Sequence, residues 1–522
     1  MTKSLSRLFR AWKRKKSRTS ASVSAELTAN LTYLQEALGS STDVVIRQFT
    51  VGSAQPVKAA LAFIDGLADN VMINESIMKP LMLEMRMVAD GLSKKDILTV
   101  IKDKVISMGQ LREVDNLSAM LDGMLSGDTV LMLDGYSSAL LFGTRGWESR
   151  GVEEPLTEAV VRGPREGFTE TLRTNTSLLR RKIKNPLLRF EVLTLGRQTR
   201  TGICIAYIKD LADEKIVSEV RKRLERIDVD SILESGYIEE FIEDAPLSPF
   251  ATVGNTEKPD VAAAKMLEGR VAILVDGTPF ALTVPYLFVE SIQTSEDYYT
   301  RTFFATLIRW IRIIALTSTA LLPAVYIALL TFHQEMIPTQ LLLSMAASAE
   351  GVPFPAFVQA FFMGLVFEIL REAGIRMPRP VGQAVSIVGA LVIGQAAVAA
   401  GLVLPSMVIV VAFTGITEFI VATQIESVTL FRIFVTGLAA VLGFYGILLA
   451  TLALLIHVLT LRSFGVPFMS PLASGSIWDL KDVFLRVPKW AMLTRPQAIP
   501  TNNRLRQKPL QYPRPPSGKK KD

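Results

Sequence analysis

The sequence has 522 residues, a formal net charge of +7 and 49% hydrophobic residues. This length allows two or three domains, each with its own core. The single cysteine, Cys204, excludes an intrachain disulfide, and its apolar surroundings predict a buried strand thiol.

Positive charge gathers at both ends of the chain. A basic arm occupies residues 1–20, and a basic, proline-rich tail occupies residues 463–522. No apolar core follows the arm, so we expect no cleavable signal peptide. Neither end carries the interleaved aromatic pattern of nucleic-acid-binding proteins. We therefore expect no nucleic acid, and we expect both ends to be attracted to the anionic inner leaflet of a membrane.

The region before the apolar runs contains an internal repeat. Residues 61–69 are echoed at 205–213, and residues 124–135 are echoed at 266–277. The two echoes keep their order and have nearly equal offsets, as expected for a duplicated domain. The sequence therefore predicts two related α/β subdomains, which we assign to residues 21–160 and 161–300.

Each copy shows the same coarse pattern of elements. Apolar runs predict strands at 45–51 and 59–64 in the first copy, and at 191–195 and 202–208 in the second. A helix with one apolar face is predicted at 214–227. Each copy closes on an apolar–Asp-Gly–apolar pattern, which is typical of a hairpin with a type I′ turn. For this reason we interpret 271–292 as a hairpin rather than a membrane span.

Nothing in the two copies indicates catalysis. The two histidines, His333 and His457, lie outside them, and no phosphate loop, metal-ligand spacing or nucleophile elbow is present. The acidic stretch 239–244 could bind a cation, but a solvated helix face explains it more simply. We expect a protein that is not an enzyme and needs no cofactor or metal.

Long apolar runs begin after residue 301, and we assign residues 301–462 to a helical membrane domain. Four segments are predicted to cross the bilayer: 311–332, 356–370, 384–404 and 434–458. The run 341–349 is too short to cross. The segment 406–423 is predicted to be re-entrant or partly inserted. Basic residues before the first span place the preceding region in the cytoplasm.

Few polar side chains interrupt these runs. We regard Glu368, Gln395 and Glu418 as candidates for an ion path, because polar groups in a membrane usually face an interior or an aqueous route. Pairing of Glu368 with Arg371, three residues later, is an equal alternative for that carboxylate. Contact between helices is an alternative for Gln395.

A stripe of small residues recurs at a spacing of seven: Gly382, Gly389 and Ala396. Small residues on one helix face allow close approach of a second helix. The stripe is consistent with packing within one chain and with packing between identical subunits.

Several stretches resemble the A subunit of the GerA-type spore germinant receptors. The resemblance covers about residues 155 to 480 and is carried by 185–191, 231–240, 297–299 and 370–384. It implies a multi-pass protein of the spore inner membrane with two partners, a transporter-like B subunit and a C lipoprotein. It also implies a homo-oligomer that forms a nutrient-gated ion channel.

Two other functions are consistent with the sequence. One is a paralogous accessory protein of the dipicolinate-release apparatus in the same membrane. The other is a secondary transporter, although the apolar half shows no inverted repeat. The expected fold class is an α/β soluble region of two related subdomains, followed by an α-helical polytopic membrane domain.

Overall fold

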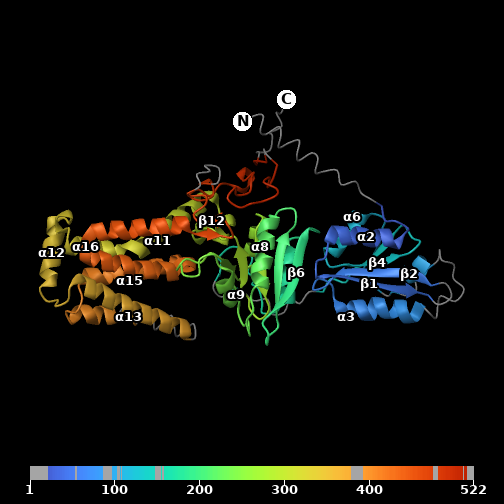
Figure 1. Ribbon diagram of the computed structural model, residues 1–522, viewed down its shortest axis with the longest axis horizontal. Helices are drawn as coiled ribbons and strands as arrows, with labels where there is room; N and C mark the ends of the chain where they lie inside the picture. Colours follow the sequence, from blue (N-terminus) through green and yellow to red (C-terminus); the bar gives the residue numbers. More distant parts are fainter. Residues whose placement is uncertain are drawn as a thin grey trace, which may run out of the picture. The chain divides into compact units, whose positions relative to one another are not determined.

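The computed structural model describes two compact units (Figure 1). The first unit holds the described parts of residues 1–243, 253–286 and 488–522, and the second holds those of 244–252 and 287–487. The described residues are 22–52, 56–85, 97–102, 106, 108–146, 155, 158–377, 389, 392–473, 480–508 and 511–513.

The first α/β subdomain is built on an antiparallel sheet with the strand order β1-β2-β4-β5-β3. Its strands are β1 (Val44–Val51), β2 (Val57–Ile64), β3 (Leu111–Val114), β4 (Thr129–Leu133) and β5 (Ala139–Phe142). The central strands are apolar on both faces because two separate cores flank the sheet. The helices α2 (Leu27–Leu38) and α6 (Leu117–Met124) contribute to one core, whereas α3 (Asn70–Ile73), η1 (Asn74–Met78), η2 (Pro80–Glu84) and α5 (Ile97–Val100) contribute to the other.

The second α/β subdomain repeats this topology in the order β6-β7-β9-β10-β8. Its strands are β6 (Leu188–Leu195), β7 (Thr201–Ile208), β8 (Gly254–Thr256), β9 (Val271–Val275) and β10 (Ala281–Val284). Its helices are α7 (Leu172–Lys182), α8 (Glu214–Glu225), α9 (Ser235–Ile242) and α10 (Pro259–Met266). The identical strand order confirms the predicted relation between the two copies. The buried face of α8 is also the predicted one.

The two copies share one contact. In each, an aspartate in the connection between two strands, β4 and β5 in the first copy and β9 and β10 in the second, contacts the start of a helix. Asp134 accepts a hydrogen bond from the backbone N–H of Leu27, at the start of α2, at 3.2 Å. Asp276 accepts one from Leu172, at the start of α7, at 2.9 Å. An aspartate at this place compensates one of the unpaired N–H groups of the helix end.

The predicted hairpins form, but the predicted turn type is wrong. Gly135 and Gly277 have positive φ angles of 90° and 92°, whereas neither preceding aspartate does. A type I′ turn needs positive φ at both central residues. The aspartate side chains are instead directed to the helix N-termini, and the connections are longer than two residues.

A buried ion pair joins the two subdomains. Arg180 on α7 contacts Asp43 at 2.7 Å, and the side chains are only 1% and 3% exposed. Beside them the backbone N–H of Thr42 donates to the carbonyl of Phe190 at 3.1 Å. Arg180 also lies over the ring of Phe190, 5.0 Å from its centroid. The start of β1 is thus fixed to the start of β6.

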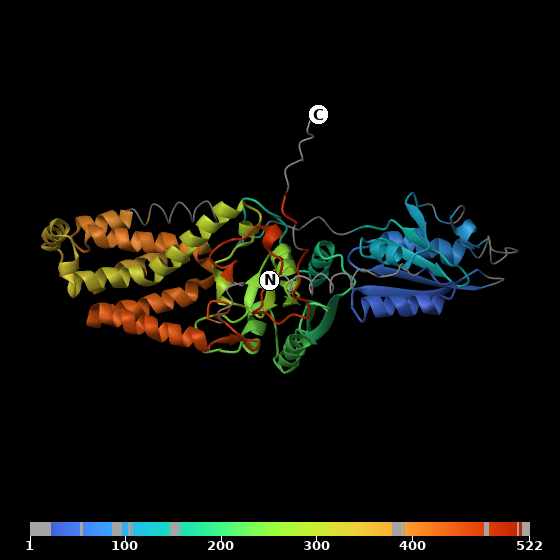
Figure 2. The same ribbon diagram turned by 90° about the horizontal axis from the view of Figure 1, so that it is seen from above.

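The second unit consists mainly of apolar helices. They are α11 (Thr302–Thr331), α12 (Thr339–Ala349), α13 (Ala356–Arg376), α15 (Pro405–Ile420) and α16 (Ile425–Thr460), and residues 392–399 are also helical. By length and composition α11 and α16 could each cross a membrane, and α15 is a shorter apolar helix. In both views α11, α13, α15 and α16 run alongside one another, while α12 lies at one end (Figures 1 and 2).

Short elements connect these parts. They are η4 (Phe288–Ser291), η5 (Ser295–Tyr298), η6 (Gln334–Met336), η7 (Ala422–Gln424), β11 (Arg462–Ser463), β12 (Val466–Pro467) and, in the first unit, η8 (Lys489–Ala491).

The chain reverses direction within α16. Gly443 has φ 60° and ψ −140°, which is not helical and favours glycine. Residues on either side of it belong to one core, with Val435 and Ala439 before it and Ile447 and Ala450 after it. The expected single span 434–458 is therefore wrong: arms 425–442 and 444–460 form a hairpin. Glycine is abundant throughout these segments, so nothing local marked this one as a reversal.

Contacts within this unit identify which helix ends lie together. At one end the His333 ring stacks on Phe444 at 4.9 Å, so the end of α11 meets the hairpin tip. At the other end the Ser427 hydroxyl donates to the carbonyl of Pro249, and the His457 ring lies 2.9 Å from the hydroxyl of the neighbouring Ser248. The start of α16 and the end of its second arm therefore share an end.

Candidate functional site in the apolar helices

Four charged side chains from three helices form a cluster. The carboxylate of Glu368 on α13 contacts Arg371, one turn later, at 2.6 Å and Arg432 on α16 at 2.9 Å. Glu418 on α15 contacts Arg432 closely and lies 3.6 Å from a nitrogen of Arg371. Each carboxylate therefore faces two guanidinium groups, and the formal charges cancel.

Burial explains why the charges of this cluster are paired. Glu418 is 1% exposed, and an unpaired charge there would carry a large desolvation cost. Removing one member leaves an uncompensated charge, which costs about 3–5 kcal/mol in typical buried pairs. The cluster thus fixes α13, α15 and α16 to one another, and its opening would expose charge within the apolar helices.

The structure brings two of the three ion-path candidates together and separates the third. Glu368 and Glu418 share the charged cluster, and Glu368 makes the alternative contact with Arg371. Gln395 lies on the exposed surface of the helical segment 392–399. The bridging role of Arg432 was not predicted from the sequence. The sequence offered one signal of this cluster, namely that both acidic and basic side chains interrupt the apolar segments.

The small-residue stripe does not present one uniform face. A Cβ atom on Gly389 would lie 2.9 Å from a methyl group of Leu370 on α13, so this glycine packs within the chain. Ala396 is exposed. Gly382 lies outside the described residues.

A second charged cluster surrounds the start of α11. Arg309, 0% exposed, contacts Asp297 at 2.9 Å and Asp482 at 3.0 Å. Arg312 contacts the same Asp297 at 2.8 Å, and the Tyr298 hydroxyl donates to Asp482 at 2.9 Å. These two arginines belong to the basic residues from which the orientation of the first span was predicted, and they bind carboxylates of the same unit. The segment after the last apolar helix is thereby fixed to α11.

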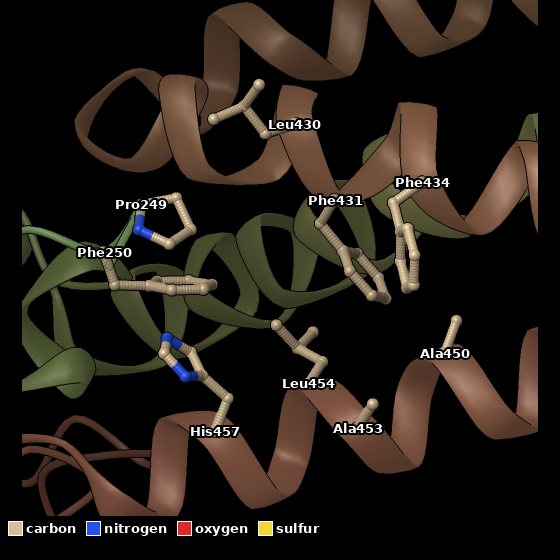
Figure 3. A pocket seen from close by; sticks show the side chains of 9 residues that line it. All are labelled: Pro249, Phe250, Leu430, Phe431, Phe434, Ala450, Ala453, Leu454 and His457. Atoms are coloured by element: carbon tan, nitrogen blue, oxygen red, sulfur yellow. The ribbon is translucent and has the colours of Figure 1, made fainter. Parts of the chain in front are cut away.

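A cavity of about 270 Å³ lies between the two arms of α16 (Figure 3). Phe431 and Phe434 line it from one arm, and Leu454 and His457 line it from the other. Phe250 closes one end, with its ring 6.2 Å from that of His457. The lining is apolar apart from this histidine, so the cavity could accept an apolar group.

Within the part of the chain that the structure describes, no group of three or more His, Cys, Asp or Glu side chains could hold a metal ion. The acidic stretch 239–244 gives no such group. Cys204 is fully buried in β7, as predicted.

A family model described as the Bacillus/Clostridium GerA spore germination protein matches residues 32–498. The chain belongs to this GerA family. The resemblance inferred from the sequence is thereby confirmed.

Individual relatives cover nearly the whole chain. Spore germination protein KA of Bacillus subtilis (strain 168) is 46% identical over 94% of this chain and 90% of that protein. Spore germination protein GerLA of Bacillus cereus is 39% identical over 90% of this chain and 95% of that protein. The chain thus belongs with A subunits of spore germinant receptors.

One solved structure matches about half of the chain. It is the N-terminal domain of the A subunit of the Bacillus megaterium spore germinant receptor GerK3. That domain is 39% identical, with a TM-score of 0.42, and the match covers 52% of this chain and 99% of that domain.

Proposed function

We propose that this chain is a receptor A subunit whose copies assemble around an axis to form a nutrient-gated ion channel. The observation that carries the proposal is the position of Gln395. In the helix 392–399, Gly394 and Ala397 are buried within the chain, whereas Gln395 and Ala396 are exposed. An amide facing lipid is costly, so a second copy is the natural cover for it.

The path of the helices supports a multi-pass topology. Six apolar segments could cross the membrane: α11, α13, the predicted span 384–404, whose described residues 392–399 are helical, α15 and the two arms of α16. The arm 425–442 is about 27 Å long at about 1.5 Å per residue, close to the hydrocarbon thickness of about 30 Å. An even number of passes leaves both α/β region and tail on one side. Positive charge before α11 favours the cytoplasm for that side.

The charged cluster supplies a gate in this proposal. While Glu368 and Glu418 are bound by Arg371 and Arg432, neither carboxylate is free to face a passing ion. A shift of α13 would separate Glu368 from Arg432 and leave a carboxylate at the path. The stripe of Gly382, Gly389 and Ala396 would allow close approach of helices during assembly.

Two partners and a location complete the proposal. The A subunit would work with a transporter-like B subunit that senses the nutrient and with a lipoprotein C subunit. The complex would lie in the spore inner membrane. In the release-apparatus alternative the protein would act after the nutrient has been sensed. In the transporter alternative it would bind and carry its own substrate.

Cysteine cross-linking tests the assembly. Gln395→Cys should form disulfide-linked dimers in oxidised membranes because identical residues approach one another around an axis. The native Cys204 is buried and gives little background. Leu365→Cys, at an exposed position on α13, is the matched control and should cross-link weakly. Equal yields from both variants would contradict an interface at Gln395.

Ion flux tests conduction. Spores carrying Glu368→Gln or Gln395→Leu should show an altered cation release on nutrient addition, by about tenfold or more, if these groups face the path. Val392→Leu, an exposed apolar substitution on the same helix, should leave release unchanged. Unchanged flux in both polar variants contradicts a role in conduction. Normal cation release with a later loss of dipicolinate release would favour the release-apparatus alternative.

Glycine substitution tests the hairpin. A Cβ atom on Gly443 would lie 3.0 Å from the Cβ of Phe332, and its φ of 60° disfavours any other residue. Gly443→Leu should lower the thermal stability of the detergent-purified protein. Gly437→Leu in the same helix is the control, because no atom lies within 4 Å of its added Cβ. Equal stability of the two variants would contradict a tight reversal at Gly443.

A further inference from the structure

The first subdomain closes itself with the residues that directly follow β5. Ala68 pairs in antiparallel fashion with Arg145. The backbone N–H of Gly146 donates to the carbonyl of Leu67 at 3.2 Å. A short extended segment thus lies along residues 67–68.

The second subdomain receives the same contacts from the far end of the chain. Ala212, the counterpart of Ala68, pairs in antiparallel fashion with Thr501. The backbone N–H of Asn502 donates to the carbonyl of Leu211 at 3.1 Å. The residues that directly follow β10 instead leave this unit after Tyr286. Thr501 and Asn502 therefore take the places of Arg145 and Gly146.

In both copies a glycine lies beneath the closing segment. We use the word groove for the backbone surface that this segment covers, residues 67–68 and 127 in the first copy and residues 211–212 and 267–269 in the second. Gly127 and Gly269 have φ angles of 95° and 102°, where other residues are strained. A Cβ atom on Gly127 would lie 2.8 Å from the carbonyl oxygen of Leu67. One on Gly269 would lie 3.0 Å from that of Leu211 and 3.1 Å from Thr501. Both grooves need glycine because two backbones approach closely there.

Side chains of the C-terminal segment add further contacts to the second copy. The amide of Asn502 donates to the carbonyl of Ala212 at 2.7 Å. Arg506 forms an ion pair with Glu268 at 2.8 Å. Arg495 donates to the carbonyl of Leu267 at 2.6 Å. The groove thus offers carbonyl oxygens and one carboxylate, and the segment supplies the donors.

Arg495 also gives the segment its shape. Its guanidinium donates to the carbonyl of Asn503 at 2.9 Å, and its backbone N–H donates to that of Arg504 at 2.9 Å. Thr494 and Leu505 pair in antiparallel fashion. The segment is therefore presented as a preorganised loop, which reduces the entropic cost of binding.

We propose that the groove formed by residues 211–212 and 267–269 is a peptide-binding site for an extended, donor-rich, basic segment, and that residues 501–506 of the same chain occupy it. Recognition resembles strand addition, in which backbone hydrogen bonds give affinity and side chains give selectivity. Because the segment follows the last apolar helix in the chain, the second subdomain is completed only by residues that come after all the apolar helices. The proposal does not depend on ion conduction.

Engineered disulfides test occupancy in the full-length protein. Paired residues on antiparallel segments have Cα atoms about 4.5–5.5 Å apart, within disulfide range. Ala212→Cys with Thr501→Cys should form an intramolecular disulfide on oxidation. Ala68→Cys with Arg145→Cys, at the equivalent place in the first copy, is the matched positive control. A disulfide in the control alone overturns the proposal, and disulfide-linked dimers of the 212/501 variant overturn occupancy by the same chain.

Substitutions and an added peptide test selectivity. Asn502→Ala and Arg506→Glu should each lower the rate of 212–501 disulfide formation, and Glu268→Arg should restore it in the Arg506→Glu background. A chain ending at residue 487 should bind a labelled peptide of residues 488–508, whereas the full-length chain should not. Asn502→Ala in the peptide should weaken binding about tenfold, because a buried carbonyl then lacks its donor. Equal binding by both chains, or by both peptides, contradicts the proposed site.

Discussion

The two α/β subdomains share a topology but differ in how they are closed. Both have the same strand order and the same aspartate contact to a helix start. The first is closed by residues 144–146, which are local, and the second by residues 501–502, which are remote. The equivalent hydrogen bonds have nearly equal lengths of 3.2 and 3.1 Å. Both copies therefore have a closing segment at the same position in the fold, although the segment comes from different parts of the chain.

The contacts between the copies are not related by the repeat. Arg180 and Asp43 come from helix α7 of the second copy and from the connection before β1 of the first. Each copy thus uses different residues of the common framework. The duplication gives both copies the same strand order, and the contact between them uses different residues from each copy.

The largest expected effect comes from breaking this junction. Asp43→Ala leaves Arg180 buried without its carboxylate, so the free energy of unfolding should fall by about 3–5 kcal/mol. Thermal or denaturant unfolding of the purified full-length protein measures this loss.

The matched control is the more exposed ion pair between the same copies. Arg173 and Asp65 are 34% and 31% exposed, and such pairs contribute about 0–1 kcal/mol. Asp65→Ala should therefore have a small effect. Similar losses for Asp43→Ala and Asp65→Ala would show that burial does not distinguish the two pairs.

A smaller effect is expected at the shared aspartates. Asp134→Ala and Asp276→Ala each remove an acceptor from a helix start, which typically costs about 1 kcal/mol. Because the contacts are equivalent, the two losses of unfolding free energy should agree within about 0.5 kcal/mol. A loss in only one variant would break the equivalence of the copies at this position.

The smallest effect is expected from thiol chemistry. Burial raises the pKa of the Cys204 thiol, so the reactive thiolate is scarce and inaccessible to a maleimide in the native protein. Ala60 occupies the equivalent strand position in the first copy and is also fully buried. Ala60→Cys should be equally unreactive, whereas Leu247→Cys, at a 99% exposed position, should react rapidly. Labelling of native Cys204 as fast as the thiol introduced by Leu247→Cys would contradict its burial.

Local features of the sequence predicted most of the α/β fold. The strands and the apolar face of α8 were predicted from short periodic patterns, and the duplication was predicted from repeated stretches of sequence. The turn type at Asp134 and Asp276 was missed because the aspartates bind helices more than 100 residues away. A local sequence pattern does not reveal a partner so far away in the chain.

The candidate site was only partly predictable for the same reason. Glu368 and Arg371 are three residues apart, so their pairing could be anticipated. The contacts of Arg432 with Glu368 and Glu418 depend on the packing of three helices. The reversal at Gly443 was also hidden, because a hydropathy profile is the same for a straight helix and for a hairpin.

The remote closing segment has a consequence for biosynthesis. Chains emerge from the ribosome from the N-terminus, and domains begin to fold as they emerge. The first subdomain has all its parts once residue 146 has been made. The second must wait with its groove at Leu211 and Gly269 unfilled until every apolar helix has been synthesised. Its folding can therefore finish only after all the apolar helices have been synthesised, so that this last step reports that the chain has been made as far as residue 502.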